Sequence, residues 1–160
     1  MSAADVLMIG VLIFAFGLGF FVVNYMMDNV VDDMVGMSQI NSSNATVTAL
    51  ESVKDTAARM DYVVFGLFIG LVLGLIVTSW FIGGNPMFMF IYFIVWVIAV
   101  VITTVLANTW ETVTDMVIFG TTITDFPLTN NLMLYLPIYI AVVGFIGFVI
   151  MFAKPYMQGE

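Results

Sequence analysis

The chain contains no cysteine and no histidine among its 160 residues. Without cysteine it has no disulfide, no thiol nucleophile and no cysteine-ligated metal, and nothing in it indicates the redox compartment. Without histidine it lacks the commonest general base and metal ligand of proteins. No Walker or GxGxxG phosphate-binding pattern occurs either. We therefore expect no zinc site, no cofactor and no enzymatic activity.

Charge is also scarce, at 9% of residues against about 25% in soluble domains, while 62% of residues are apolar. A globule of this size cannot bury so much apolar surface. Runs of about 20 apolar residues without a charge are typical of transmembrane helices. Four such runs cover 6–26, 63–83, 87–107 and 132–153. We therefore predict one all-α membrane domain over 1–160, in which four transmembrane helices form a bundle.

Segment 27–61 is polar, but its apolar residues keep helical spacing on both sides of SQINSSNAT, where Ser43 or Asn44 can cap a helix. The two stripes are Met27, Val30, Met34, Met37 and Val47, Leu50, Val53, Ala57, Met60, Val64. We predict that the first two membrane helices extend beyond the bilayer as an antiparallel hairpin; the alternative is a flexible polar loop. Asn41 and Asn44 also match the N-glycosylation pattern, which is too short to decide their modification.

The remaining connections differ in length. The turn GGNPM at 83–87 makes the second and third helices antiparallel. Leu106, Trp110, Val113 and Val117 continue the spacing of the third helix into the loop 108–131, and Gly120 and Pro127 then interrupt it. Thr129, Asn130 or Asn131 is expected to cap the last helix. Pro137 either kinks that helix or lies in its first turns.

Four spans place both termini and the 83–87 turn on one side of the membrane and the loops 27–61 and 108–131 on the other. The loop side carries nine of the eleven acids, together with Lys54 and Arg59. Basic residues favour a cytoplasmic loop side, whereas so acidic a surface is typical of an external one. Because these cues conflict, the orientation stays open, with a slight preference for internal termini.

Asp28, Asp32 and Asp33 are the densest acidic cluster. They could hold calcium, but carboxylates spaced i, i+4 and i+5 on a helix point apart, so we interpret them as a solvated face. Together with Trp110 they are predicted to form an extramembrane contact surface.

Glycine and other small residues recur at helical spacing within the spans. Gly66, Gly70 and Gly74 form a groove that Thr78 extends, and Gly144 and Gly147 add a second small surface. Tyr92, Trp96 and Thr103 belong to a heptad seam on the third helix, and Gly10 and Gly17 lie in the first. Helices in lipid associate through such close packing. These residues therefore serve the chain's own bundle, contacts with other proteins, or both.

The function predicted from these features is structural. The chain is expected to be an assembly subunit of a large membrane complex, or a membrane component of a lipid-containing virus particle. Its expected partners are the bilayer and other copies, membrane subunits or capsid subunits, and no nucleic acid. The alternative is an oligomeric pore, holin-like channel or small transporter. The absence of ionisable residues from all four runs argues against ion transport by one copy, although threonine and glycine can line a pore formed by several.

Overall fold

The computed structural model describes residues 4–82 and 86–157, without the side chains of 4, 6, 78, 82, 86, 88 and 154–157. Every regular element within these ranges is a helix. Four stretches are long and apolar enough to cross a membrane: Leu7–Gly36, Asn44–Phe81, Met89–Thr114 and Leu136–Ala153. The predicted all-helical chain with four potential membrane spans is therefore confirmed.

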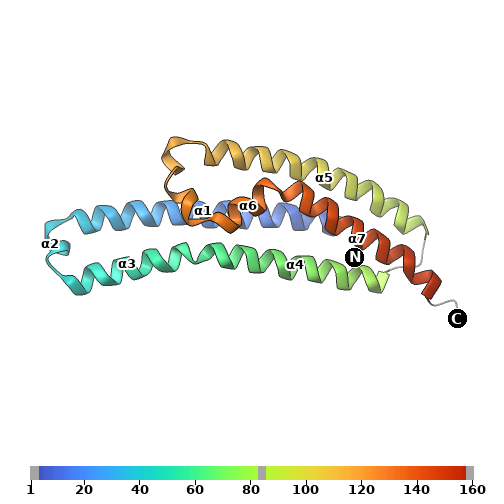
Figure 1. The fold of residues 1–160 in the computed structure, drawn as a ribbon, viewed down its shortest axis with the longest axis horizontal. Coiled ribbons are helices and arrows are strands. Elements are labelled where there is room, and N and C mark those ends of the chain that lie inside the picture. The colour runs from blue at the N-terminus through green and yellow to red at the C-terminus, as the bar shows by residue number, and fades with distance from the viewer. Residues whose placement is uncertain (1–3, 83–85, 158–160) are drawn as a thin grey trace.

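The first half of the chain forms two long antiparallel rods (Figure 1). Helix α1 (Ala4–Gly36) is unbroken over 33 residues, about 50 Å at 1.5 Å per residue. The short helix α2 (Ser38–Asn41) leads into α3 (Asn44–Ala58), and a single turn at Arg59 separates α3 from α4 (Met60–Ile82). Ser43 is the N-cap residue of α3, as expected, but its side chain makes no capping hydrogen bond.

The second half contains the third and fourth apolar runs. Helix α5 (Pro86–Thr114) extends well past residue 107 and ends before Val117. Two short 3-10 helices, η1 (Val117–Phe119) and η2 (Thr122–Asp125), lead to α6 (Pro127–Leu134) and α7 (Leu136–Met157). The third run thus belongs to one helix that continues beyond it, while the fourth is divided between α6 and α7.

The division of the fourth run corrects the prediction of one helix over 132–153. Tyr135 leaves the helical conformation, with φ −100° and ψ 12°. Pro137 follows two residues later and has no N–H to donate to the preceding turn. The N–H groups of Ile138 and Tyr139 both bond to the carbonyl of Tyr135, which starts the new helix. Pro137 therefore lies in the first turn of α7, directly after a helix break.

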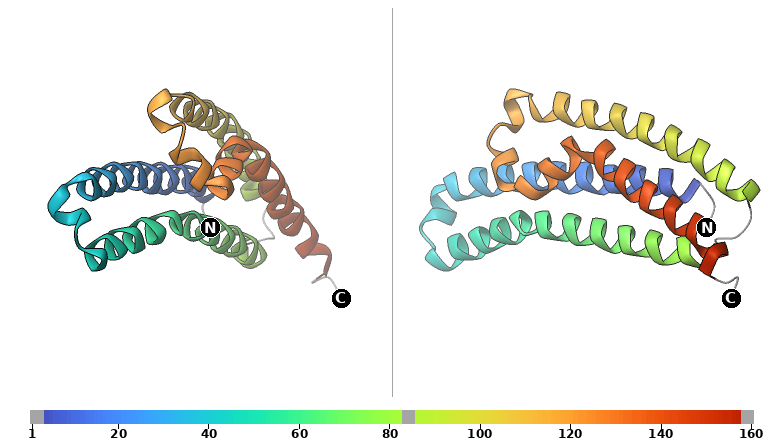
Figure 2. Two further views of the ribbon diagram at one scale, coloured as in Figure 1. Left: turned by 60° about the vertical axis from the view of Figure 1, so that its left-hand side comes forward. Right: turned by 45° about the vertical axis from the view of Figure 1, so that its right-hand side comes forward.

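Helices α1 and α7 lie between α4 and α5, as the views in Figures 1 and 2 agree. Helix α5 packs mainly against α7 and α1, and α4 packs mainly against the same two helices. Helices α4 and α5 run in opposite directions, as predicted, but they make few contacts with each other. The predicted turn between them lies mostly outside the described residues.

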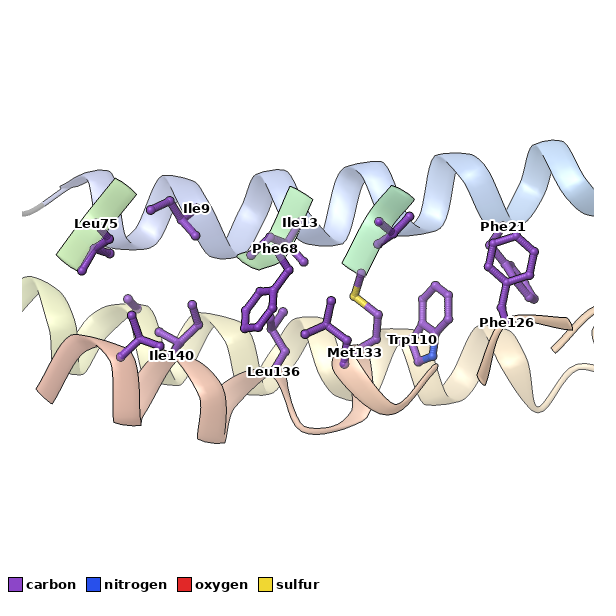
Figure 3. Close-up of a cluster of buried hydrophobic side chains, with 14 of the residues drawn as sticks. Ile9, Ile13, Phe21, Phe68, Leu75, Trp110, Phe126, Met133, Leu136 and Ile140 are labelled. Atoms are coloured by element: carbon purple, nitrogen blue, oxygen red, sulfur yellow. The ribbon is translucent and has the colours of Figure 1, made fainter. Parts of the chain in front are cut away.

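The core runs along the length of this arrangement (Figure 3). At the end nearer the loops, the rings of Trp110 and Phe126 lie 5.2 Å and 6.0 Å from the ring of Phe21. Toward the termini, Ile9, Leu75 and Ile140 are buried between α1, α4 and α7. Many outward side chains of the same helices are also apolar and exposed, which suits a lipid environment.

Candidate functional site: helix-packing and assembly surfaces

Helices α5 and α7 meet where two aromatic rings lie over two glycines. A Cβ atom added to Gly144 would collide with the indole of Trp96, and one added to Gly147 would lie 2.6 Å from the Tyr92 hydroxyl oxygen. The same Tyr92 hydroxyl donates a 3.1 Å hydrogen bond to the carbonyl of Gly144. The Trp96 indole N–H donates to the carbonyl of Ile140 at 3.3 Å. These glycines therefore serve packing inside the chain, and the polar atoms of both rings have partners.

Helix α1 packs against α5 and α6 through its own glycines. A Cβ on Gly10 would lie 2.7 Å from the methyl carbon of Thr103, and one on Gly17 would collide with the end of Met133. Thr103 is 1% exposed, and its hydroxyl donates to the carbonyl of Ala99 at 2.9 Å. The predicted packing residue Thr103 is thus buried where α5 packs against α1.

The glycine stripe of α4, which we define as Gly66, Gly70 and Gly74, lies on an outward-facing surface. All three residues are exposed, and, apart from the adjacent residues and backbone of α4 itself, no atom of the described residues lies within 4 Å of a Cβ added to any of them. The side chain of Thr78, predicted to extend the stripe, is outside the described part of the chain. The structure therefore buries Gly10 and Gly17 of α1 and Gly144 and Gly147 of α7 in the chain's own packing, whereas the α4 stripe, like Gly19 and Gly36 of α1, faces outward.

The outward glycines border an open apolar groove between α4 and α1. A cavity of about 290 Å³ lies between Gly70 and Gly74 on one side and Met8 and Leu12 on the other, with Asp5 near its end. The missing side chains leave the backbone of α4 as one wall of this groove. A helix or a lipid chain can approach that backbone closely.

Asp61 has a structural role that was not recognised in the sequence. It is 2% exposed at the start of α4, and its two carboxylate oxygens accept hydrogen bonds from the backbone N–H groups of Leu128 and Thr129, at 3.0 and 2.6 Å. These donors belong to the first turn of α6, where N–H groups have no partner within the helix and an anion is favoured. Asp61 therefore caps α6 from another helix.

The prediction that Thr129, Asn130 or Asn131 caps the last helix is wrong, because α6 begins at Pro127 and all three lie inside it. Asn130 instead accepts a 2.9 Å hydrogen bond from the indole N–H of Trp110. The sequence does contain a signal that α6 is capped from elsewhere. Pro127 starts the helix, and the side chain of the preceding residue, Phe126, cannot accept a hydrogen bond from the first turn. Such a helix needs an acceptor from elsewhere in the fold.

Trp110 was predicted to belong to an extramembrane contact surface, but the structure places it in the core. Its side chain is fully buried against Phe21, and its indole N–H bonds to Asn130. The heptad seam that contains Tyr92 and Thr103 continues to Trp110, and all three of these residues are buried. Trp110 is therefore a core residue near the end of α5.

The predicted acidic contact surface joins α1 to α3. The Lys54 ammonium lies 3.2 Å from the exposed Asp32 and 3.6 Å from the half-buried Asp28, and Asp33 is exposed as well. Burial raises the pKa of Asp28 despite the attraction of Lys54, with further increases from Asp125 and Asp32. Burial lowers the pKa of Lys54, but its hydrogen bond to Asp32 and the charge of Asp28 outweigh this and raise it. Lys54 therefore holds two of the three acids in a tether between helices.

A polar cavity of about 470 Å³ adjoins this tether and is also lined by Tyr25 and the η2 residues Thr124 and Asp125. Within 4–82 and 86–157, no group of three or more acidic side chains is arranged to hold a metal ion.

No known protein family, no curated protein and no solved structure matches this chain significantly.

Proposed function

We propose that the chain is a non-catalytic structural subunit of a larger membrane assembly, in a cellular membrane or in the internal membrane of a lipid-containing virus particle. The observation that carries this proposal is the outward glycine stripe Gly66, Gly70 and Gly74. Its three members recur at i, i+4 spacing and are exposed, while Gly10, Gly17, Gly144 and Gly147 serve the chain's own packing. The intramolecular use of the stripe, which the sequence left open, is therefore disfavoured.

The energetic reasoning follows from helix propensity. Glycine inside a helix is destabilising by about 1 kcal/mol relative to alanine in water. Lipid chains do not need glycine to solvate a helix, so three glycines on a lipid-facing stripe bring no evident gain to an isolated chain. A neighbouring helix does gain, because its backbone can approach closely and increase dispersion contacts. The stripe therefore fits best as the docking surface of another membrane helix.

The helical hairpin of α1 and α3 fits the same role. Helix α1, at about 50 Å, is longer than the roughly 30 Å hydrocarbon core of a bilayer. We place the part beyond residue 26, together with α2 and α3, outside the membrane. The Lys54 tether to Asp28 and Asp32 stiffens this projection. Its exposed acids, Asp33 among them, would then provide solubility or docking for polar partners.

Mild-detergent purification of the tagged chain from its native membrane tests this function. We expect another membrane or capsid subunit, or further copies of the chain, to co-purify in fixed proportion. A chain that stays monomeric and produces steady conductance in planar bilayers would contradict the proposal and favour a pore. Burial of Thr103 against Gly10 supports the structural role, because that threonine is not available to line a pore on an outer face.

A further inference from the structure

A second cavity between α1 and the α3–α4 rod differs from the glycine groove. It has a volume of about 360 Å³, and most of its wall is apolar. The lining residues are Phe20, Val23, Asn24 and Met27 of α1, with Ser52, Val53, Thr56, Ala57 and Met60 of α3 and α4. An apolar cavity with a few polar groups is the usual form of a small-ligand site.

Asn24 is the exceptional member of this wall. Its side chain is 1% exposed, and neither its amide oxygen nor its amide nitrogen has a hydrogen-bond partner in the part of the chain that the structure describes. A buried amide without partners is destabilising unless something else bonds to it. Leucine has a similar volume and would avoid this cost. The unpartnered amide in the wall of a cavity therefore points to a ligand that brings a polar atom.

The cavity lies where the apolar runs give way to polar sequence. Phe20 and Val23 belong to the last turns of the 6–26 run, and Met60 directly precedes the 63–83 run. In the membrane placement proposed above, this is the level at which lipid ester groups lie between the acyl chains and the headgroups. A bound lipid would bring its ester carbonyls to the level of Asn24.

Charged residues beside the cavity match a zwitterionic headgroup. Glu51 and Asp55 of α3 and Arg59, which directly follows α3, are all exposed, and their i, i+4 spacing forms a stripe next to the cavity-lining residues Ser52 and Thr56. Arg59 is nearest the membrane, while Asp55 and Glu51 lie about 6 and 12 Å farther along the helix. A phospholipid has the same order, with the phosphate deeper and the ammonium farther out.

We infer that this cavity binds one zwitterionic phospholipid. An acyl chain fills the apolar walls, and the Asn24 amide N–H donates to an ester carbonyl while its oxygen accepts from an accompanying water. Arg59 contacts the phosphate, and Asp55 and Glu51 attract the ammonium. This inference rests on the proposed membrane placement of the chain, and it is independent of whether the glycine stripe binds another helix.

Photolabelling of the protein in lipid nanodiscs tests the site. The probe is a phosphatidylcholine with a photoreactive acyl chain, and labelled positions are mapped by peptide mass spectrometry. We expect labels to concentrate on the cavity residues Val23, Met27 and Val53, and to fall about tenfold in Asn24→Leu, as expected for the loss of a hydrogen-bonding group. Asn29→Leu is the matched control, because Asn29 is exposed and bonds to the Tyr25 carbonyl of its own helix.

Thermal unfolding of the delipidated protein in detergent provides the second readout. Added phosphatidylcholine should raise the unfolding midpoint of the wild type and of Asn29→Leu, but not that of Asn24→Leu, whose midpoint without lipid should equal or exceed that of the wild type. Phosphatidylglycerol, which lacks the ammonium, should protect less.

Labels spread evenly over all lipid-facing helices, or unchanged labelling in Asn24→Leu, would overturn the inference in favour of ordinary bilayer contact. Protection by phosphatidylglycerol as strong as by phosphatidylcholine would overturn the headgroup assignment. If the wild-type protein carries the lipid label at the cavity but no other subunit co-purifies with it, the result would count against the assembly role alone.

Discussion

The carboxylate of Asp61 accepts a 2.6 Å hydrogen bond from the backbone N–H of Thr129, a residue 68 positions farther along the chain. This contact joins the start of α4 to the first turn of α6. Because α6 is followed by the break at Tyr135, its position sets where the fourth apolar run can turn into α7. One buried carboxylate thus links the two halves of the chain.

Replacement of Asp61 should therefore destabilise the fold. Asp61→Leu removes both acceptors and leaves the N–H groups of Leu128 and Thr129 without a partner, for an expected loss of about 3 kcal/mol in unfolding free energy. Asp61→Asn keeps one acceptor oxygen and should lose less. Unfolding in mixed micelles measures both, with the exposed Asp33→Asn as the control. Equal stability of Asp61→Leu and the wild type would show that the cap is dispensable.

The two classes of glycine make opposite predictions for the same substitution. Gly144→Ala places a methyl group against the Trp96 indole, which must shift, so we expect about 1–3 kcal/mol of destabilisation. Gly70→Ala enters open space and improves helix propensity, so the isolated chain should be unchanged or slightly more stable. Thermal unfolding of the two purified variants provides the comparison. A larger loss in Gly70→Ala would mean that the stripe packs inside the chain.

Asp28 provides a prediction about pH. Burial raises its pKa above the ordinary value of 3.8, even with Lys54 beside it. The folded protein therefore holds this proton more tightly than the unfolded chain. The resulting stabilisation is complete below 3.8 and is lost as the pH rises through the raised pKa.

Asp28→Asn cannot ionise, so the fall in stability over that pH interval should become shallower, without destabilisation at neutral pH. Unfolding midpoints measured across the interval test this, with Asp33→Asn again as the control. A variant that keeps the wild-type slope, or that unfolds more easily at neutral pH, would show that the Lys54 contact outweighs the burial of Asp28.

Hydropathy was sufficient to predict the helical class and the four potential spans, because each run lacks charges over about 20 residues. Residue type also indicated Ser43 or Asn44 as the cap of α3, and the structure has Ser43 at this position. The break at Tyr135 was harder to predict, since a proline near a helix start is compatible with a continuous helix or with a new one. Only the position of α6 in the fold distinguishes these outcomes.

Pairings between distant residues were beyond the sequence. Asp61 was one of nine acids on the loop side, and nothing local shows that its partners lie in the first turn of α6. Trp110 lies at the end of the seam that begins with Tyr92, yet its position past residue 107 suggested an exposed site. Likewise, glycines at helical spacing face outward on α4 and inward on α7. A span that is apolar on all sides does not indicate which of its faces packs inside the protein.

The most direct test of the assembly role is the mass of the native complex formed by Gly70→Leu, extracted in mild detergent and compared with the wild type and with Gly36→Leu. Gly36 is exposed near the end of α1, away from the glycine stripe, and a Cβ there also meets open space. We expect Gly70→Leu to keep the wild-type unfolding midpoint as a single chain but to lose its partner or further copies, while Gly36→Leu keeps them. A Gly70→Leu complex of full wild-type mass would contradict the account.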